Sequence, residues 1–207
     1  MHLLEPYFEV TIVKLYAMKN LLKSLLVLLF FTFSANVLVA QSFINGNLWY
    51  NMDPAKPLAK VKVTLNLIDG QNNKSWTCHT DNNGLYEFLY LKPGTYKISF
   101  SSTLKAAQVT QADADLLWDY IYKGAPLTAM QLLAADIDGS GDVTIADYNL
   151  LLANIYQYVP FPTGDWQFQT LTITLTSGGL KSADGDPKDL GGICSGDVGG
   201  TFVPGTK

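Results

Sequence analysis

Apolar and polar residues alternate along the chain between residues 42 and 102. The apolar members of three such runs are Val61, Val63, Leu65 and Leu67, then Tyr86, Phe88 and Tyr90, and then Tyr96, Ile98 and Phe100. A period of two predicts half-buried β-strands, so we expect these side chains to face one interior. The polar, glycine-containing runs 81–84 and 92–94 supply turns. Short strands at this spacing favour a small β-sandwich over residues 41–102.

Helical spacing replaces the alternation farther along the chain. Residues 109–121 align with residues 143–155 at an offset of 34 positions (143 − 109 = 34), and each run predicts one helix. Between them, a short helix is predicted to follow Pro126, with Thr128 as its cap. We expect Asp113 to cap the first helix rather than to hold a metal. Residues 103–159 are therefore predicted to form a three-helix unit.

The remaining residues, 160–207, are rich in glycine, and residues 166–175 alternate again. This composition predicts a C-terminal segment of loops with one or two strands. The runs 184–186 and 196–201 look like pieces of calcium loops. Neither keeps a full ligand set, so we expect turns there and no metal.

The segment 136–147 carries the strongest candidate chemistry. It places oxygen-bearing side chains at loop positions one, three, five, nine and twelve, with glycine at position six. This is the ligand spacing of an EF-hand-type Ca²⁺ loop, and Ca²⁺ prefers about six to eight oxygen ligands. The expected metal-binding residues are Asp136, Asp138, Ser140, Asp142 through its carbonyl, Thr144 through a water, and Asp147. An acidic, glycine-rich turn that holds no ion is the alternative.

The loop and the helix after it, with its Leu150-Leu151 pair, resemble a type I dockerin repeat. The resemblance implies a secreted, non-catalytic docking module that binds a cohesin-like protein and often accompanies polysaccharide-degrading machinery. Dockerins carry two repeats, but the offset of the alignment puts Ser102, Leu104 and Ala106 where the first three ligands of the first repeat belong. We therefore expect one occupied calcium site and one vestigial site.

The runs 80–88 and 91–98 resemble the carboxypeptidase-regulatory-like and collagen-adhesin B-type family of prealbumin-like sandwiches. The resemblance implies a stalk or spacer, which in some members carries a Lys–Asn isopeptide bond. Lys60 or Lys62 with Glu87 would be the candidates, but the alternation places both lysines on the solvent face. The expected fold class is thus mixed and multi-module: a prealbumin-like β-sandwich, a dockerin-like, EF-hand-type helical unit, and a β- and loop-rich C-terminal segment.

Residues 18–40 have the three parts of a secretory signal peptide. A basic start is followed by an apolar run over 25–33 and by small residues that end at Ala40, after which cleavage is expected. An uncleaved anchor is the alternative, but the run is shorter than the roughly 20 residues that span a membrane. We expect a secreted or cell-surface protein that meets the membrane only during export. Whether Met1 or Met18 is the true start stays open.

Composition narrows the partners. The 207 residues carry a formal net charge of −4 and no basic run, which argues against nucleic acid as a partner. Export would expose Cys78 and Cys194 to an oxidising compartment, and a disulfide between them stays open. The aromatic residues Trp49, Tyr50, Trp76 and Trp166 invite a sugar-binding interpretation, but aromatic side chains in strands more often pack in the core.

The expected function is that of a secreted, non-catalytic, calcium-binding modular protein for protein–protein attachment. Its partner would be a cohesin-like protein or a neighbouring module, in the setting of polysaccharide breakdown. A C-terminal fragment of a cell-surface adhesin and an accessory part of a glycoside hydrolase are the alternatives. Glycoside hydrolysis requires two carboxylates across a cleft, and the chain has few acidic residues outside the calcium loop, so we expect no enzyme.

Overall fold

The computed structural model describes residue 19 and residues 42–68, 74–176 and 188–204. Contacts group residues 41–207 into one unit, and the description below concerns that unit. The predicted signal peptide, residues 18–40, lies outside the described residues except for Lys19. No helix within the described part of the chain is both long enough and apolar enough to cross a bilayer.

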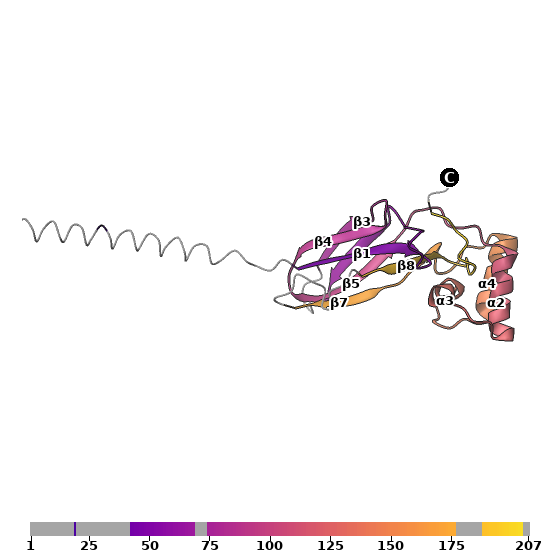
Figure 1. The fold of residues 1–207 in the computed structure, drawn as a ribbon. Helices are drawn as coiled ribbons and strands as arrows, with labels where there is room; N and C mark the ends of the chain where they lie inside the picture. Colours follow the sequence, from indigo (N-terminus) through magenta and orange to yellow (C-terminus); the bar gives the residue numbers. More distant parts are fainter. Residues whose placement is uncertain (1–18, 20–41, 69–73, 177–187, 205–207) are drawn as a thin grey trace, which may run out of the picture. The chain divides into compact units, whose positions relative to one another are not determined.

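The described residues contain eight strands, which form two four-stranded sheets (Figure 1). The first sheet has the order β4-β1-β8-β6, and its strands are Leu85–Leu91, Ser42–Tyr50, Leu190–Cys194 and Trp166–Phe168. The second sheet has the order β3-β2-β5-β7, and its strands are Ser75–His79, Lys62–Leu67, Gly94–Ser101 and Leu171–Leu175. Neighbouring strands are antiparallel except for β1 and β8, which are parallel. The predicted β-sandwich is therefore confirmed.

The sandwich core contains most of the side chains that the alternation predicted to face inward. Val61, Val63 and Leu65 are fully buried. Tyr90 is an exception, because 71% of its surface is exposed and its φ is +59°. The register between β1 and β4 shifts at this point, and Leu91 takes the buried place that we expected for Tyr90. A β-bulge of this kind turns every following side chain to the other face.

The C-terminal residues complete both sheets. We expected one or two strands after residue 160 in a segment separate from the sandwich, whereas the described residues contain three, β6, β7 and β8. β8 lies between β1 and β6, and β7 pairs with β5. The sandwich consequently extends well beyond the predicted boundary at residue 102. Periodicity shows that a segment is a strand, but it carries no information about which strand becomes its neighbour.

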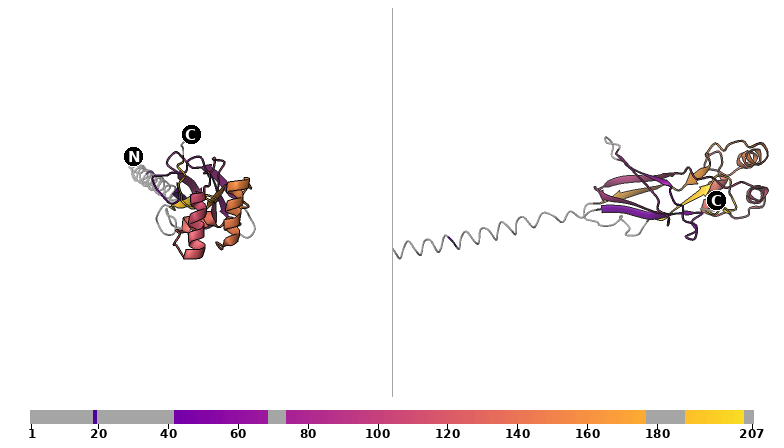
Figure 2. Two further views of the ribbon diagram at one scale, coloured as in Figure 1. Left: turned by 90° about the vertical axis from the view of Figure 1, so that its right-hand side faces the viewer. Right: turned by 90° about the horizontal axis from the view of Figure 1, so that it is seen from above.

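Three helices gather at one end of the sandwich, and α2 and α4 lie side by side (Figures 1 and 2). They are α2, Gln111–Lys123, α3, Ala129–Ala135, and α4, Ile145–Gln157, as the sequence predicted. The side chain of Thr128 accepts a hydrogen bond from the backbone N–H of Gln131 and caps α3. Asp113 is buried at the third position of α2, where it accepts from the backbone N–H of Thr110. A second apolar core lies among the helices, apart from the core of the sandwich.

Candidate metal centre

The loop 136–147, which we call the cation loop, runs from the end of α3 into the first turn of α4. Gly139 and Gly141 have φ values of +73° and +92°, which favour glycine, and the chain turns sharply there. Val143 packs against the helical core from the eighth loop position. Local sequence therefore explains the path of the loop, because each unusual backbone angle falls on a glycine.

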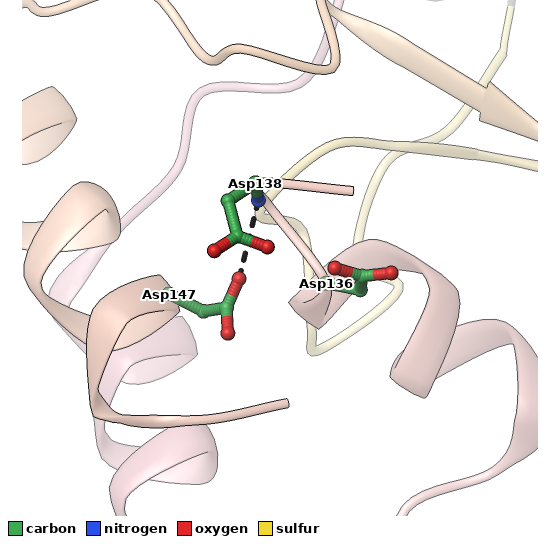
Figure 3. Close-up of side chains that lie close together, drawn as sticks. All are labelled: Asp136, Asp138 and Asp147. Atoms are coloured by element: carbon green, nitrogen blue, oxygen red, sulfur yellow. Dashed lines mark hydrogen bonds between the residues drawn. The ribbon is translucent and has the colours of Figure 1, made fainter. Parts of the chain in front are cut away.

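Three carboxylates converge inside this loop (Figure 3). They belong to Asp136, Asp138 and Asp147, and one oxygen of each lies within 4.8 Å of the others. Two oxygens that bind the same Ca²⁺ at about 2.3–2.6 Å cannot lie more than roughly 5 Å apart. The three side chains thus meet the distance condition for one shared ion. Ca²⁺ would also neutralise carboxylates that repel one another at this separation.

Asp136 supplies the most specific sign of a missing partner. Its Oδ2 atom accepts a hydrogen bond of 2.9 Å from the backbone N–H of Gly141. Its Oδ1 atom is buried and has no hydrogen-bond partner among the described residues. A buried, ionised oxygen without a partner is costly, and a cation is the partner that suits it best. The donor set therefore fits a hard divalent cation such as Ca²⁺.

Asp147 is fully buried, and protein donors engage both of its oxygens. Oδ1 accepts from the backbone N–H groups of Ile137 at 2.8 Å and Asp138 at 3.2 Å. Oδ2 accepts from the backbone N–H of Thr144 at 2.8 Å and from its hydroxyl at 3.3 Å. These four bonds match the roughly four acceptor sites of a carboxylate. Asp147 consequently ties the two ends of the loop together, in addition to its place among the three acids.

Asp138 is exposed, with its Oδ1 atom 2.9 Å from the backbone N–H of Ser140. Hydrogen bonds from the side chain and backbone of Ser140 lower the pKa of Asp138. These hydrogen bonds favour the ionised form of the carboxylate, which is the form that a cation site requires. The Ser140 hydroxyl also donates to the Asp142 carbonyl at 3.1 Å, so these two predicted ligands lie next to each other.

Thr144 is the N-cap of α4. Its side chain accepts from the backbone N–H of Ala146 at 3.2 Å and donates to Asp147. The predicted role of Thr144, to hold a bridging water, is therefore joined by a capping role, which Ser and Thr commonly have before a helix. All six predicted metal-binding residues lie in one loop, and the structure brings three of their carboxylates together.

The first repeat departs from the expected arrangement. We placed Ser102, Leu104 and Ala106 at the ligand positions that precede α2. In the structure, Leu104 and Ala106 pack against the sandwich core, and the Leu104 carbonyl accepts from the indole N–H of Trp166 at 2.9 Å. Residues 195–204, which we call the C-terminal strap, instead contact the start of α2. The Gly199 backbone N–H of the strap donates to Asp113 at 2.9 Å.

The two cysteines are unpaired in the structure, Cys194 buried and Cys78 half-buried. Cys194 lies on β8 in the first sheet, and Cys78 lies on β3 in the second. The Cys194 sulfur accepts a hydrogen bond of 3.2 Å from the Ala107 backbone N–H. Burial raises the pKa of the Cys194 thiol to about 11 and also raises that of Cys78. Both thiols are thus held in the neutral, poorly nucleophilic form at neutral pH.

A comparison with protein families finds a match for part of the chain. The model described as SdrD B-like domain matches residues 45–116, which include most of β1, all of β2 to β5 and the start of α2. The match supports the collagen-adhesin B-type prediction for the sandwich and points to an adhesin-type module of the kind typical of cell-surface proteins. It ends before the cation loop, whose resemblance to a dockerin repeat stays a prediction. No curated protein matches the chain.

Proposed function

We propose that the protein is a non-catalytic attachment module of the cell surface or the extracellular space, in which one Ca²⁺ stabilises the helices beside the sandwich. The observation that carries the proposal is the buried Oδ1 of Asp136, which has no hydrogen-bond partner within the described part of the chain and lies beside the carboxylates of Asp138 and Asp147. The match of residues 45–116 to an adhesin-type domain supports the surface location.

The role proposed for the ion is structural. Asp136 follows α3 directly, and Asp147 lies in the first turn of α4, so an ion between them would join two helices. Each helix is short, and isolated helices of this length are marginal in water. An ion present at about 100 times its dissociation constant adds about 2.7 kcal/mol to the stability of the folded state. That amount is a large part of the stability of a small unit.

A protein is the proposed partner, and the exposed aromatic side chains of α2 support this choice. Trp118 is 39% exposed, and its ring lies 4.1 Å from that of Tyr122 and 5.2 Å from that of Tyr148 on α4. Trp and Tyr are enriched at the centres of protein interfaces. A cohesin-like protein or a neighbouring module of the same system would suit this face, in a setting of polysaccharide breakdown.

A module of a larger surface adhesin is the second candidate function, because the family match is to an adhesin-type domain. In that case the sandwich would act as a spacer, and attachment would depend on other parts of the adhesin. An accessory role in a glycoside hydrolase is the weaker alternative. The two leading candidates differ in whether the helical face binds a partner.

Calorimetric titration with Ca²⁺ tests the metal site. Residues 41–207 should bind one ion, and Asp136→Asn should weaken binding by at least tenfold because it removes a charged ligand. Asp142→Asn is the matched control, since it removes the same charge from an exposed residue. Asp142 is proposed to bind the ion through its backbone carbonyl, which the substitution keeps. Equal losses in the two variants would indicate a general charge effect and would contradict the proposed site.

Capture from extracellular fractions of the source organism tests attachment. Trp118→Ala should abolish capture of a specific protein, whereas Trp76→Ala on β3 should not, although Trp76 is similarly exposed at 37%. Binding of a glycan panel that is lost in Trp118→Ala would replace the protein partner with a carbohydrate. Capture that is unaffected by either substitution would favour the spacer function.

A further inference from the structure

The C-terminal strap repeats the hydrogen-bonding pattern of the cation loop. In the cation loop, the Asp136 carboxylate accepts from the backbone N–H five residues later, that of Gly141, at 2.9 Å. In the strap, the Asp197 carboxylate likewise accepts from the backbone N–H five residues later, that of Phe202, at 3.0 Å. Each aspartate therefore holds the turn that follows it in the same way.

The strap and the cation loop also agree at their second and fourth positions, counted from Asp197 and Asp136. Ile137 and Val198 follow the two aspartates, and both are fully buried in the same apolar core. The N–H of each donates to the carbonyl two residues earlier, at 3.0 Å for Ile137 and 2.9 Å for Val198. At the fourth position, Gly139 and Gly200 have φ values of +73° and +62°. The strap thus matches the first half of the cation loop at the first, second and fourth positions, whereas the sixth positions differ in backbone, because Gly141 has a φ of +92° and Phe202 does not have a positive φ.

The first half of the cation loop and the strap each donate a hydrogen bond to an aspartate in the first turn of a helix. The third residue of the cation loop, Asp138, donates its N–H to Oδ1 of Asp147 at 3.2 Å. The third residue of the strap series, Gly199, donates its N–H to Oδ1 of Asp113 at 2.9 Å. Asp113 and Asp147 are each the third residue of their helices and close the capping box there. The helix α2 therefore has a complete loop, but the two halves are far apart in the sequence, one directly before α2 and the other in the strap.

The composite loop differs from the cation loop at the position of the ion. Two donors from Thr201 engage Oδ1 of Asp197, at 3.0 and 3.2 Å. The Tyr50 hydroxyl donates to Oδ2, to which the Phe202 N–H also donates. Tyr50 is fully buried in the sandwich and also accepts from the Cys194 N–H at 3.2 Å. A neutral phenol thus satisfies the carboxylate that an ion would otherwise have to neutralise, and Gly199 offers no side-chain ligand at the third position.

We propose that the C-terminal strap is the transposed first half of the α2 loop and that the Tyr50 hydroxyl takes the place of its cation. In this proposal, the order of the loop before α4 depends on a cation. The loop before α2 is ordered without a cation, because Tyr50 of β1 holds it to the sandwich. The strap is further held by α3, because the Gln131 side chain donates to the Val198 carbonyl at 2.9 Å. The cation dependence of the loop before α4 rests on the proposed function, whereas the closure of α2 does not.

Hydrogen exchange of residues 41–207, measured by mass spectrometry with Ca²⁺ and with a chelator, tests the proposal. Chelation should speed exchange in the cation loop and at the start of α4, and should leave α2 and the strap unchanged. Tyr50→Phe should speed exchange in the strap and at the start of α2 by about tenfold or more with or without Ca²⁺, because a buried charge loses one hydrogen bond. The response of the cation loop to Ca²⁺ should persist in this variant.

Thr201→Val provides a milder variant in case Tyr50→Phe does not fold, because Thr201 is exposed and its hydroxyl makes one of the four bonds to Asp197. It should speed exchange in the same two segments to a smaller extent. Binding of two Ca²⁺ ions per chain, or equal protection of α2 and α4 by Ca²⁺, would overturn the proposal. Binding of none would refute the proposed function alone, and the exchange of the strap in the two variants would still decide the closure of α2.

Discussion

Replacement of Asp136 by asparagine should stabilise the protein without Ca²⁺ and destabilise it with Ca²⁺. Asparagine has nearly the shape of aspartate, and its carbonyl can still accept from the Gly141 N–H that Asp136 now binds. Its amide group would replace the buried Oδ1 atom, for which the described residues offer no hydrogen-bond partner. The substitution therefore changes the charge of the site and leaves its packing nearly intact.

The gain without the ion follows from the distances. A pair of unit charges 4.8 Å apart, the upper limit among these oxygens, repels by about 1 kcal/mol in water and about 3 kcal/mol at an effective dielectric of 20. The repulsion between Asp136 and the exposed Asp138 should be about 1 kcal/mol, the value in water. The hydrogen bonds that Asp147 accepts offset part of the negative charge of Asp147. In a chelator, we expect the variant to gain roughly 1–3 kcal/mol in its free energy of unfolding.

The loss with the ion follows from binding linkage. At a Ca²⁺ concentration about 100 times its dissociation constant, the wild-type protein gains about 2.7 kcal/mol, and a tenfold weaker variant gains only about 1.4 kcal/mol. The benefit of Ca²⁺ should therefore be smaller in the variant by at least about 1.3 kcal/mol. A variant that no longer binds the ion would lose the entire gain.

Urea unfolding followed by far-ultraviolet circular dichroism measures both free energies in the same protein preparation. The asparagine variant should unfold at a higher urea concentration than wild type in chelator, and its midpoint should shift less when Ca²⁺ is added. Asp142→Asn again serves as the charge-matched control and should keep the full response to Ca²⁺. If Asp136→Asn destabilises the protein equally in both conditions, Asp136 has a purely structural role and the reasoning is refuted.

Three further predictions concern the sandwich and its junction with the strap. Stability should fall as the pH rises from about 9 towards 11. Burial raises the pKa of Cys194 from 9.0 to about 11 and also raises that of Tyr50, so both groups lose their protons more readily in the unfolded chain. Unfolding curves across this pH range, with Cys194→Ala as the comparison, measure the effect. Gly46→Ala should cost about 3 kcal/mol or more in urea unfolding, since its new Cβ would lie 1.9 Å from the Lys188 carbonyl oxygen. Thr80→Val should cost about 2–4 kcal/mol by the same measurement, because it leaves two buried backbone groups without the hydroxyl that now bonds both; a loss below 0.5 kcal/mol would contradict the burial that we describe.

Local signals in the sequence were sufficient for the helices and for most of the first five strands. Helix α3 has a proline, Thr128 and Gln131 in the order of a capped start, and the structure shows the capping box there. Alternation likewise identified the buried face of β2, because neighbouring side chains of a strand point in opposite directions. The prediction of inward-facing side chains was wrong only at Tyr90, where a bulge inserts a residue. A bulge depends on the partner strand as much as on the strand itself.

The cation loop was also accessible from sequence, since its predicted ligands, its glycines and the cap of α4 all lie within 12 consecutive positions, 136–147. The strap carries a related signal, an aspartate followed by an aliphatic residue and, three and four positions after the aspartate, by glycine and a hydroxyl residue. Asp197, Val198, Gly200 and Thr201 match Asp136, Ile137, Gly139 and Ser140 in this pattern. That similarity alone does not show which helix receives the strap.

The sequence by itself determined the three helices, strands such as β2, β4 and β5, and the loop that gathers acidic side chains, because those properties depend on neighbours within one turn or one hairpin. Only the tertiary structure decided that β8 lies parallel to β1, that the strap closes the loop of α2, and that Tyr50 donates to Asp197. These contacts join residues more than 80 positions apart. Their partners are chosen by burial and by the hydrogen bonds that buried polar groups require, and neither leaves a periodic trace along the chain.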